Sequence, residues 1–100
     1  MILVIDTTNR DRITVSLKQE EQTIDILTDN NKFGSQVLLP TITKLLKKNN
    51  LEFKDLEAVE LNPGPGSFTG IRVGASVANA LAYSLNIPVN GKKVETDLNY

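Results

Sequence analysis

Two short segments of this sequence carry the residues best suited to chemistry. The first is an Asp-Thr-Thr triplet that follows an apolar run, and the second is a turn rich in glycine and proline that ends at a serine. A glycine turn that leads into a helix leaves free N–H groups at the helix N-terminus, where an anion can bind. An aspartate beside two hydroxyls can hold a metal-bridged phosphate. The candidate anion- or nucleotide-binding residues are therefore Asp6, Thr7, Thr8, Gly64, Gly66 and Ser67.

Both segments also have a purely structural interpretation. Asp6 is a residue type that forms turns by accepting backbone N–H bonds, and the glycine turn can be only a tight strand-to-helix connection. The turn lacks the lysine of a P-loop, because neither Gly66 nor Gly70 is followed by one. A two-metal nuclease needs several converging carboxylates. The residue just before the glycine turn, where a second carboxylate would be needed, is Asn62 and not an acid.

The composition excludes several classes of site. The chain has 100 residues, enough for one small domain, and contains neither cysteine nor histidine. Thiolate chemistry, a Ser/His/Asp triad and histidine-based zinc sites are therefore impossible. The net charge of -1, from 11 basic and 12 acidic residues, indicates no nucleic-acid surface. Because no signal peptide or membrane-length apolar run is present, we expect a soluble, cytoplasmic domain. Because the residue types needed for a nucleophile with its base or for a metal site are missing, we expect no catalytic residues and no metal site.

The elements that must position the two segments follow from hydrophobic periodicity. A continuous apolar run predicts a buried central strand at residues 2–5, and alternating patterns predict two more strands joined to it as an antiparallel meander. Residues 28–35 are predicted to form a loop, and the polar residues 90–100 a loosely held tail. The five expected strands are residues 2–5, 12–18, 23–27, 56–61 and 87–89.

Two helices are predicted, at residues 36–48 and 67–85. Pro40 leaves two alternatives for the first, a start near the proline or a kinked first turn. Since each helix connects strands that run parallel, right-handed crossovers give a mixed sheet of strand order 3-2-1-4-5. The predicted fold class is therefore α/β, a ribonuclease H-like single domain with a five-stranded sheet and two main helices.

The second helix is apolar over more than one face, which is wider than the stripe of about 100° needed to cover a core. Small residues recur at every fourth position, a spacing that lets another backbone approach. They either fit against the domain's own sheet or, as we prefer, allow the helix to pack on another chain as well. On the preferred interpretation, Gly74→Leu leaves the monomer folded but abolishes assembly. The small residues are Gly70, Gly74, Ala78 and Ala82.

Three segments of the sequence, residues 2–8, 36–40 and 64–74, occur in an order and spacing that closely resembles the N-terminal domain of the TsaB family, also called YeaZ. The most specific of them reads Gly-Pro-Gly-Ser-Phe-Thr-Gly. The resemblance implies an actin-like ATPase (ribonuclease H-like) domain over residues 1–90, followed by a polar tail at 91–100. It further implies that the usual second domain is absent, either in a natural single-domain protein or in a fragment.

The resemblance implies a non-catalytic subunit that binds TsaD, the threonylcarbamoyl transferase that modifies position 37 of tRNA. Family members pack their two helices on those of TsaD, can homodimerise when alone, and work with the ATPase TsaE. They need no cofactor of their own, and ATP or ADP and a metal are expected in the complex with TsaD. Contact with tRNA is expected only within that complex. The implied interface residues are Leu38, Ile42, Leu45, Phe68, Thr69, Arg72, Val73, Ser76, Val77 and Ala80. The alternative is a stand-alone nucleotide- or anion-binding domain.

Overall fold

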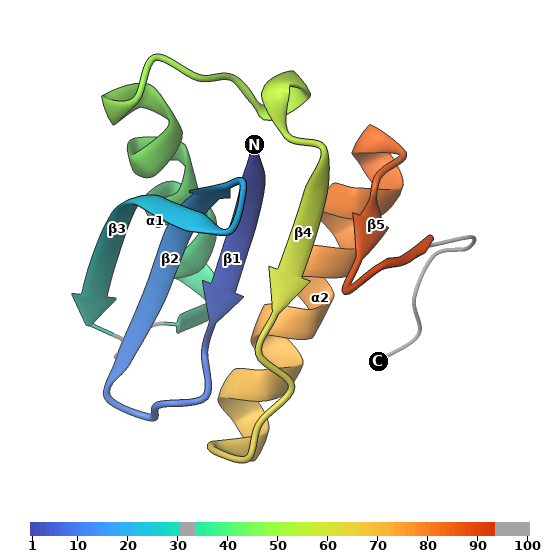
Figure 1. Ribbon diagram of the computed structural model, residues 1–100. Helices are drawn as coiled ribbons and strands as arrows, with labels where there is room; N and C mark the ends of the chain where they lie inside the picture. The colour runs from blue at the N-terminus through green and yellow to red at the C-terminus, as the bar shows by residue number, and fades with distance from the viewer. Residues whose placement is uncertain (31–33, 94–100) are drawn as a thin grey trace.

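A six-stranded mixed sheet with two long helices on one of its faces is the framework of the chain (Figure 1). This computed structural model describes residues 1–30 and 34–93. The strand order is β3-β2-β1-β4-β5-β6, which confirms the predicted α/β sheet and its order 3-2-1-4-5. In chain order the elements are β1 (Ile2–Asp6), β2 (Arg12–Gln19), β3 (Gln22–Asn30), α1 (Gly34–Lys48), η1 (Phe53–Asp55), β4 (Ala58–Leu61), α2 (Phe68–Leu85), β5 (Pro88–Val89) and β6 (Lys92–Lys93).

The central strand β1 joins the two halves of the sheet. It pairs antiparallel with β2 and parallel with β4, while β3 continues the meander and β5 runs parallel to β4. A two-residue turn connects β2 to β3, and both of its residues, Glu20 and Glu21, have positive φ angles, as the twist of a tight hairpin requires. The predicted meander and the two parallel crossovers are confirmed.

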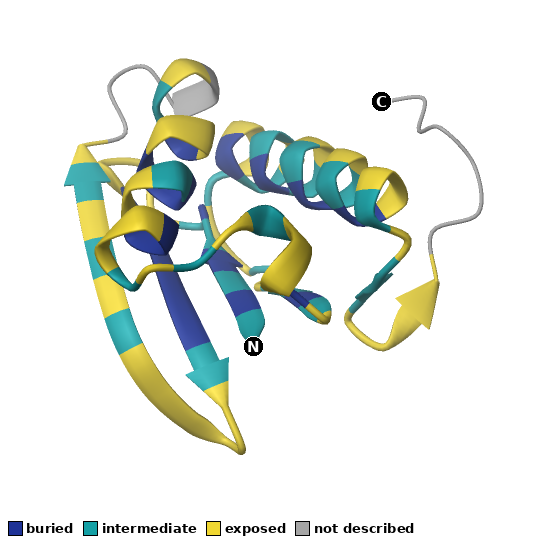
Figure 2. Ribbon diagram, turned by 90° about the horizontal axis from the view of Figure 1, so that it is seen from above, coloured by how far each residue is buried: buried dark blue, intermediate teal, exposed yellow. Residues whose placement is uncertain are grey.

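The hydrophobic core lies between the sheet and the two helices, which Figure 2 shows on the same side of the strands. Leu3 and Ile5 of the central strand are fully buried there, as is the apolar stripe of α1. Pro40 lies inside α1 rather than at its start, on the exposed side of the helix. Within the described residues, neither helix has the length and hydropathy needed to cross a membrane.

Two predictions about the connections are wrong. Residues 28–30 were expected in a loop but extend β3, because β2 is long enough to pair Thr28 with Thr14 and Asn30 with Arg12. The expected loose tail begins instead with a hairpin, since Lys92–Lys93 pairs with β5 through a turn at Asn90-Gly91. An Asn-Gly pair is the sequence signal for such a turn. The rest of the predicted tail, residues 94–100, lies outside the described residues.

The face of the sheet opposite the helices carries both exposed apolar side chains and an ion pair. Ile24 and Ile26 of β3 are 49% and 54% exposed. Across the neighbouring strands, the Nζ of Lys18 on β2 contacts Oε2 of Glu60 on β4 at 2.6 Å, and this ion pair spans β1. The isoleucines of this face provide matched controls for the exposed apolar residues of the helices.

Candidate functional site

The two segments with chemical potential meet at one end of the sheet, where β1 ends and α2 begins. The Ser67 N–H donates to the carbonyl oxygen of Thr8 at 2.7 Å. The buried Thr7 hydroxyl donates to the carbonyl oxygen of Gly70 at 2.6 Å. Ser67 also caps α2, because its hydroxyl oxygen accepts the N–H of Gly70 at 3.2 Å. The start of α2 is therefore bonded to the chain's own residues 7 and 8.

The glycines of this junction are required by close packing within the monomer. A Cβ atom at Gly66 would overlap the carbonyl oxygen of Thr8, and one at Gly70 would overlap the carbonyl oxygen of Thr7. At Gly74 it would overlap the Thr7 hydroxyl. The stripe of small residues on α2 is buried against the domain's own sheet. The small residues therefore serve the domain's own core, and the idea that they let another backbone approach is wrong. The other part of our preferred interpretation, that α2 packs inward and also on another chain, stays a prediction.

Asp6 acts as a turn former at the end of β1. Its Oδ1 accepts the Thr8 N–H at 2.9 Å and the Thr8 hydroxyl at 2.6 Å, and its Oδ2 accepts the side-chain amide of Asn62 at 3.1 Å. Burial alone would raise the pKa of Asp6, but these three hydrogen bonds outweigh it and lower the pKa below its ordinary value. Within residues 1–30 and 34–93, no three acidic residues gather in a way that could hold a metal ion.

The lowered pKa of Asp6 predicts a pH-dependent contribution to stability. A carboxylate whose pKa is lower in the folded state stabilises the fold above its unfolded pKa, and that contribution is lost as the pH falls through the folded pKa. We expect Asp6→Asn to lower the free energy of unfolding by about 1 kcal/mol at neutral pH. The difference from wild type should shrink below about pH 4. Urea unfolding of wild type and Asp6→Asn at pH 7, 4 and 3 measures this difference in the free energy of unfolding. Asp11→Asn is the control for removing one negative charge.

A difference between wild type and Asp6→Asn that stays constant from pH 7 to pH 3 would contradict this prediction. It would mean that the carboxylate contributes through packing or through bonds that the asparagine also makes.

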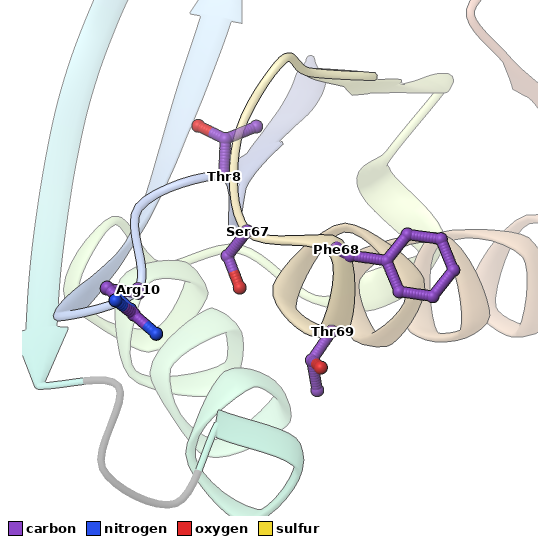
Figure 3. A pocket seen from close by; sticks show the side chains of 5 residues that line it. All are labelled: Thr8, Arg10, Ser67, Phe68 and Thr69. Carbon is purple, nitrogen blue, oxygen red and sulfur yellow. The ribbon is translucent and has the colours of Figure 1, made fainter.

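A shallow pocket of about 420 Å³ lies just outside the junction (Figure 3). Its lining residues are Thr8, Arg10, Ser67, Phe68 and Thr69. Of the predicted anion-binding residues only Thr8 and Ser67 line it, because Thr7 is buried and the carboxylate of Asp6 is turned toward its own hydrogen-bond donors. Gly64 and Gly66 belong to the turn and are not among the lining residues. The prediction missed Arg10, which no sequence pattern connects to the glycine turn.

The outward side of the two helices forms an exposed surface that, unlike the pocket, carries large apolar side chains. Phe68 is 73% exposed, and the guanidinium of Arg72 lies 5.3 Å from the centre of its ring. We call this outward side the helix surface. Half-buried residues border it and also pack against the core. The helix surface comprises Leu39, Phe68, Thr69, Arg72, Ser76, Ala80 and Tyr83, with Val73 and Val77 half-buried at its border.

Three residues predicted in the partner interface are wrongly placed. Leu38, Ile42 and Leu45 have no exposed surface, because they form the stripe of α1 that packs on the sheet. A partner cannot contact them while the monomer is folded. The exposed apolar residue of α1 is Leu39 instead, which lies off that stripe and is 45% exposed. Periodicity identifies the apolar face of a helix, and in α1 this face covers the core.

Comparison with known proteins assigns the chain to a family. The family model described as TsaD, tRNA N6-adenosine threonylcarbamoyltransferase, matches residues 5–91. The tRNA threonylcarbamoyladenosine biosynthesis protein TsaB of Bacillus subtilis is 34% identical over 89% of this chain and 39% of its own length. The TsaB protein of Buchnera aphidicola from Schizaphis graminum is 35% identical over 91% of this chain and 43% of its own length.

A solved structure supports the same assignment. YeaZ from Pseudomonas aeruginosa superposes with a TM-score of 0.78 at 29% identity, covering 88% of this chain and 41% of that one. The chain thus spans about 40% of the length of these relatives. The predicted resemblance and the actin-like fold are confirmed, and the chain belongs to the TsaB/YeaZ family.

Proposed function

We propose that this chain is a non-catalytic subunit that binds and stabilises the TsaD threonylcarbamoyl transferase, in the cytoplasm, during formation of N6-threonylcarbamoyladenosine at position 37 of tRNA. Membership of the TsaB/YeaZ family supports the pathway, since the relatives are named for threonylcarbamoyladenosine biosynthesis. The observation that carries the proposal is the helix surface, where Phe68 is the most exposed of the large apolar side chains described.

The helix surface has the properties of a protein interface. An exposed aromatic ring beside an arginine is a combination that is enriched among residues contributing most to binding. Leu39 and Tyr83, 45% and 47% exposed, add apolar area from both helices. Burying such area against a partner stabilises a complex by about 25 cal/mol per Å² before the costs of association are subtracted. We therefore place TsaD on the outer side of α1 and α2.

The proposed role needs no chemistry from this chain. The sequence has no cysteine or histidine, and the carboxylate of Asp6 is engaged by Thr8 and Asn62. ATP or ADP and a metal would belong to the partner complex, TsaE would join that complex, and tRNA would contact this chain only within it. The chain would contribute binding energy and a rigid helix pair.

The solution mass of a mixture tests this proposal. The chain and TsaD of the same organism are mixed at micromolar concentration, and the mass is measured by light scattering after size exclusion. We expect a species whose mass is the sum of one copy of each. If the mixture contains only the two separate proteins, the proposal is wrong. The chain measured alone reports whether a homodimer competes.

A second candidate function is nucleotide or anion binding at the pocket beside α2. The observation that favours it is the position of Arg10 near the start of the helix, facing Ser67 and Thr69 across the pocket (Figure 3). The tight packing of Gly66 and Gly70 on residues 7 and 8 weighs against it, because it leaves no room inside the turn. Calorimetry with ATP and ADP decides: micromolar binding that Arg10→Ala abolishes would favour this function.

A further inference from the structure

The two helices carry charge of only one sign. Together α1 and α2 contain three lysines and one arginine but no aspartate or glutamate. The whole chain has more acidic than basic residues, 12 against 11. None of the acidic residues belongs to α1 or α2, so the helical layer is basic although the protein has a net charge of -1.

Most of this positive charge is available to a partner. Lys48 is matched by Asp25 of β3, with its Nζ 3.2 Å from the carboxylate. Lys44, Lys47 and Arg72 are exposed, and none of them forms an ion pair with another of the described residues. Lys44 and Lys47 lie on the outward side of α1, and Arg72 lies on the helix surface of α2. The outward side of the two helices therefore combines exposed apolar residues with three cations that no carboxylate of the described residues pairs with.

We propose that the partner surface docking on these helices is acidic, and that the cations select this partner over a second copy of the chain. This inference rests on the proposed function, because it describes the same helix surface. Complementary charge accelerates the encounter of two proteins and suppresses wrong partners, with less effect on the final affinity. The occupant that fits is a surface of TsaD that carries apolar side chains and has carboxylates opposite Lys44, Lys47 and Arg72.

A homodimer through the same surface would lack that complementarity. In a two-fold symmetric contact, the same surface patch faces itself. Each copy would then bring Lys44, Lys47 and Arg72 toward the same cations of the other, and neither helix offers a carboxylate in exchange. We therefore expect self-association through the helices to be weak at low salt and to strengthen as salt screens the repulsion.

Charge reversal on α1 tests the inference with a matched control. The test variant is Lys44→Glu/Lys47→Glu. The control is Lys92→Glu/Lys93→Glu, which makes the same change in net charge at exposed positions on the edge strand β6. Association with TsaD of the same organism is followed by stopped-flow or surface plasmon resonance at about 50 mM and about 500 mM salt. The test variant should associate at least about tenfold more slowly at low salt, and this difference should largely vanish at high salt.

The outcomes separate this inference from the proposed function. Slow association of the test variant with the control within about twofold of wild type supports an acidic partner surface. If a complex forms but both variants behave alike, the partner surface is not acidic there and only this inference fails. If wild type forms no complex at either salt concentration, the proposed function fails and the inference with it. Circular dichroism checks that each variant keeps its fold. If the two glutamates disturb α1, the neutral variant Lys44→Gln/Lys47→Gln replaces them, and it should slow association by about half as much on a logarithmic scale.

Discussion

Replacing Gly74 by leucine is expected to lower the free energy of unfolding of the isolated monomer by about 3 kcal/mol or more. Any side chain at this position meets the Thr7 hydroxyl and lies 3.1 Å from Cδ1 of Leu61, so α2 would have to move off the sheet. The gain in helix propensity from replacing a glycine is about 1 kcal/mol and cannot offset this. Because small domains have about 5–15 kcal/mol of stability, the loss is a large fraction of the total.

Urea unfolding of the chain alone measures this effect, without any partner. Ser76→Leu is the matched control, because it places the same side chain two residues away on the exposed side of α2. We expect the control to unfold with wild-type stability. A folded Gly74→Leu monomer with an unchanged midpoint would restore the interpretation that the small residues of α2 serve assembly rather than the core.

The arrangement of the strands was predictable because each signal is local. The apolar run at residues 2–5 predicted a central strand buried on both faces. Its central place is confirmed, but burial on both faces is wrong, because both helices cover the side of Leu3 and Ile5 and leave Ile2 and Val4 half-buried on the other side. The short connections between the alternating strands predicted the antiparallel turns. The hairpin at Asn90-Gly91 was equally local and was missed because the polar residues around it show no period. Two-residue strands are too short for periodicity to detect.

The candidate site was less predictable because its features depend on contacts between distant segments. A repeat of glycine and alanine indicates close approach, but only the structure shows that the group approaching Gly70 and Gly74 is Thr7 of the same chain rather than another chain. The same holds for α1, where the period that makes Leu38, Ile42 and Leu45 one stripe does not say whether sheet or partner covers it. Arg10 reaches the pocket through the shape of the loop after β1, which sequence spacing does not encode.

Removing the ring of Phe68 is expected to weaken binding to TsaD by about 30-fold or more, the loss typical of a residue that dominates an interface. The ring is 73% exposed in the monomer, and its described ring contact is the guanidinium of Arg72 at 5.3 Å. A partner would bury both groups together, so that Phe68→Ala removes apolar area and leaves Arg72 without the aromatic face it lies on. The monomer should keep its thermal midpoint, because so little of the ring packs on the fold.

Calorimetry of each variant with TsaD measures the affinity, and Ile26→Ala is the control. Ile26 is a large apolar residue of comparable exposure, 54%, but it lies on the face of the sheet opposite the helices. We expect Ile26→Ala to bind as wild type does. If Phe68→Ala binds normally while Ile26→Ala is weakened, TsaD contacts the open face of the sheet, and the helix surface is not the interface. If neither variant changes the affinity, the contact is centred elsewhere on α1 and α2, and Leu39→Ala and Tyr83→Ala become the next variants to measure.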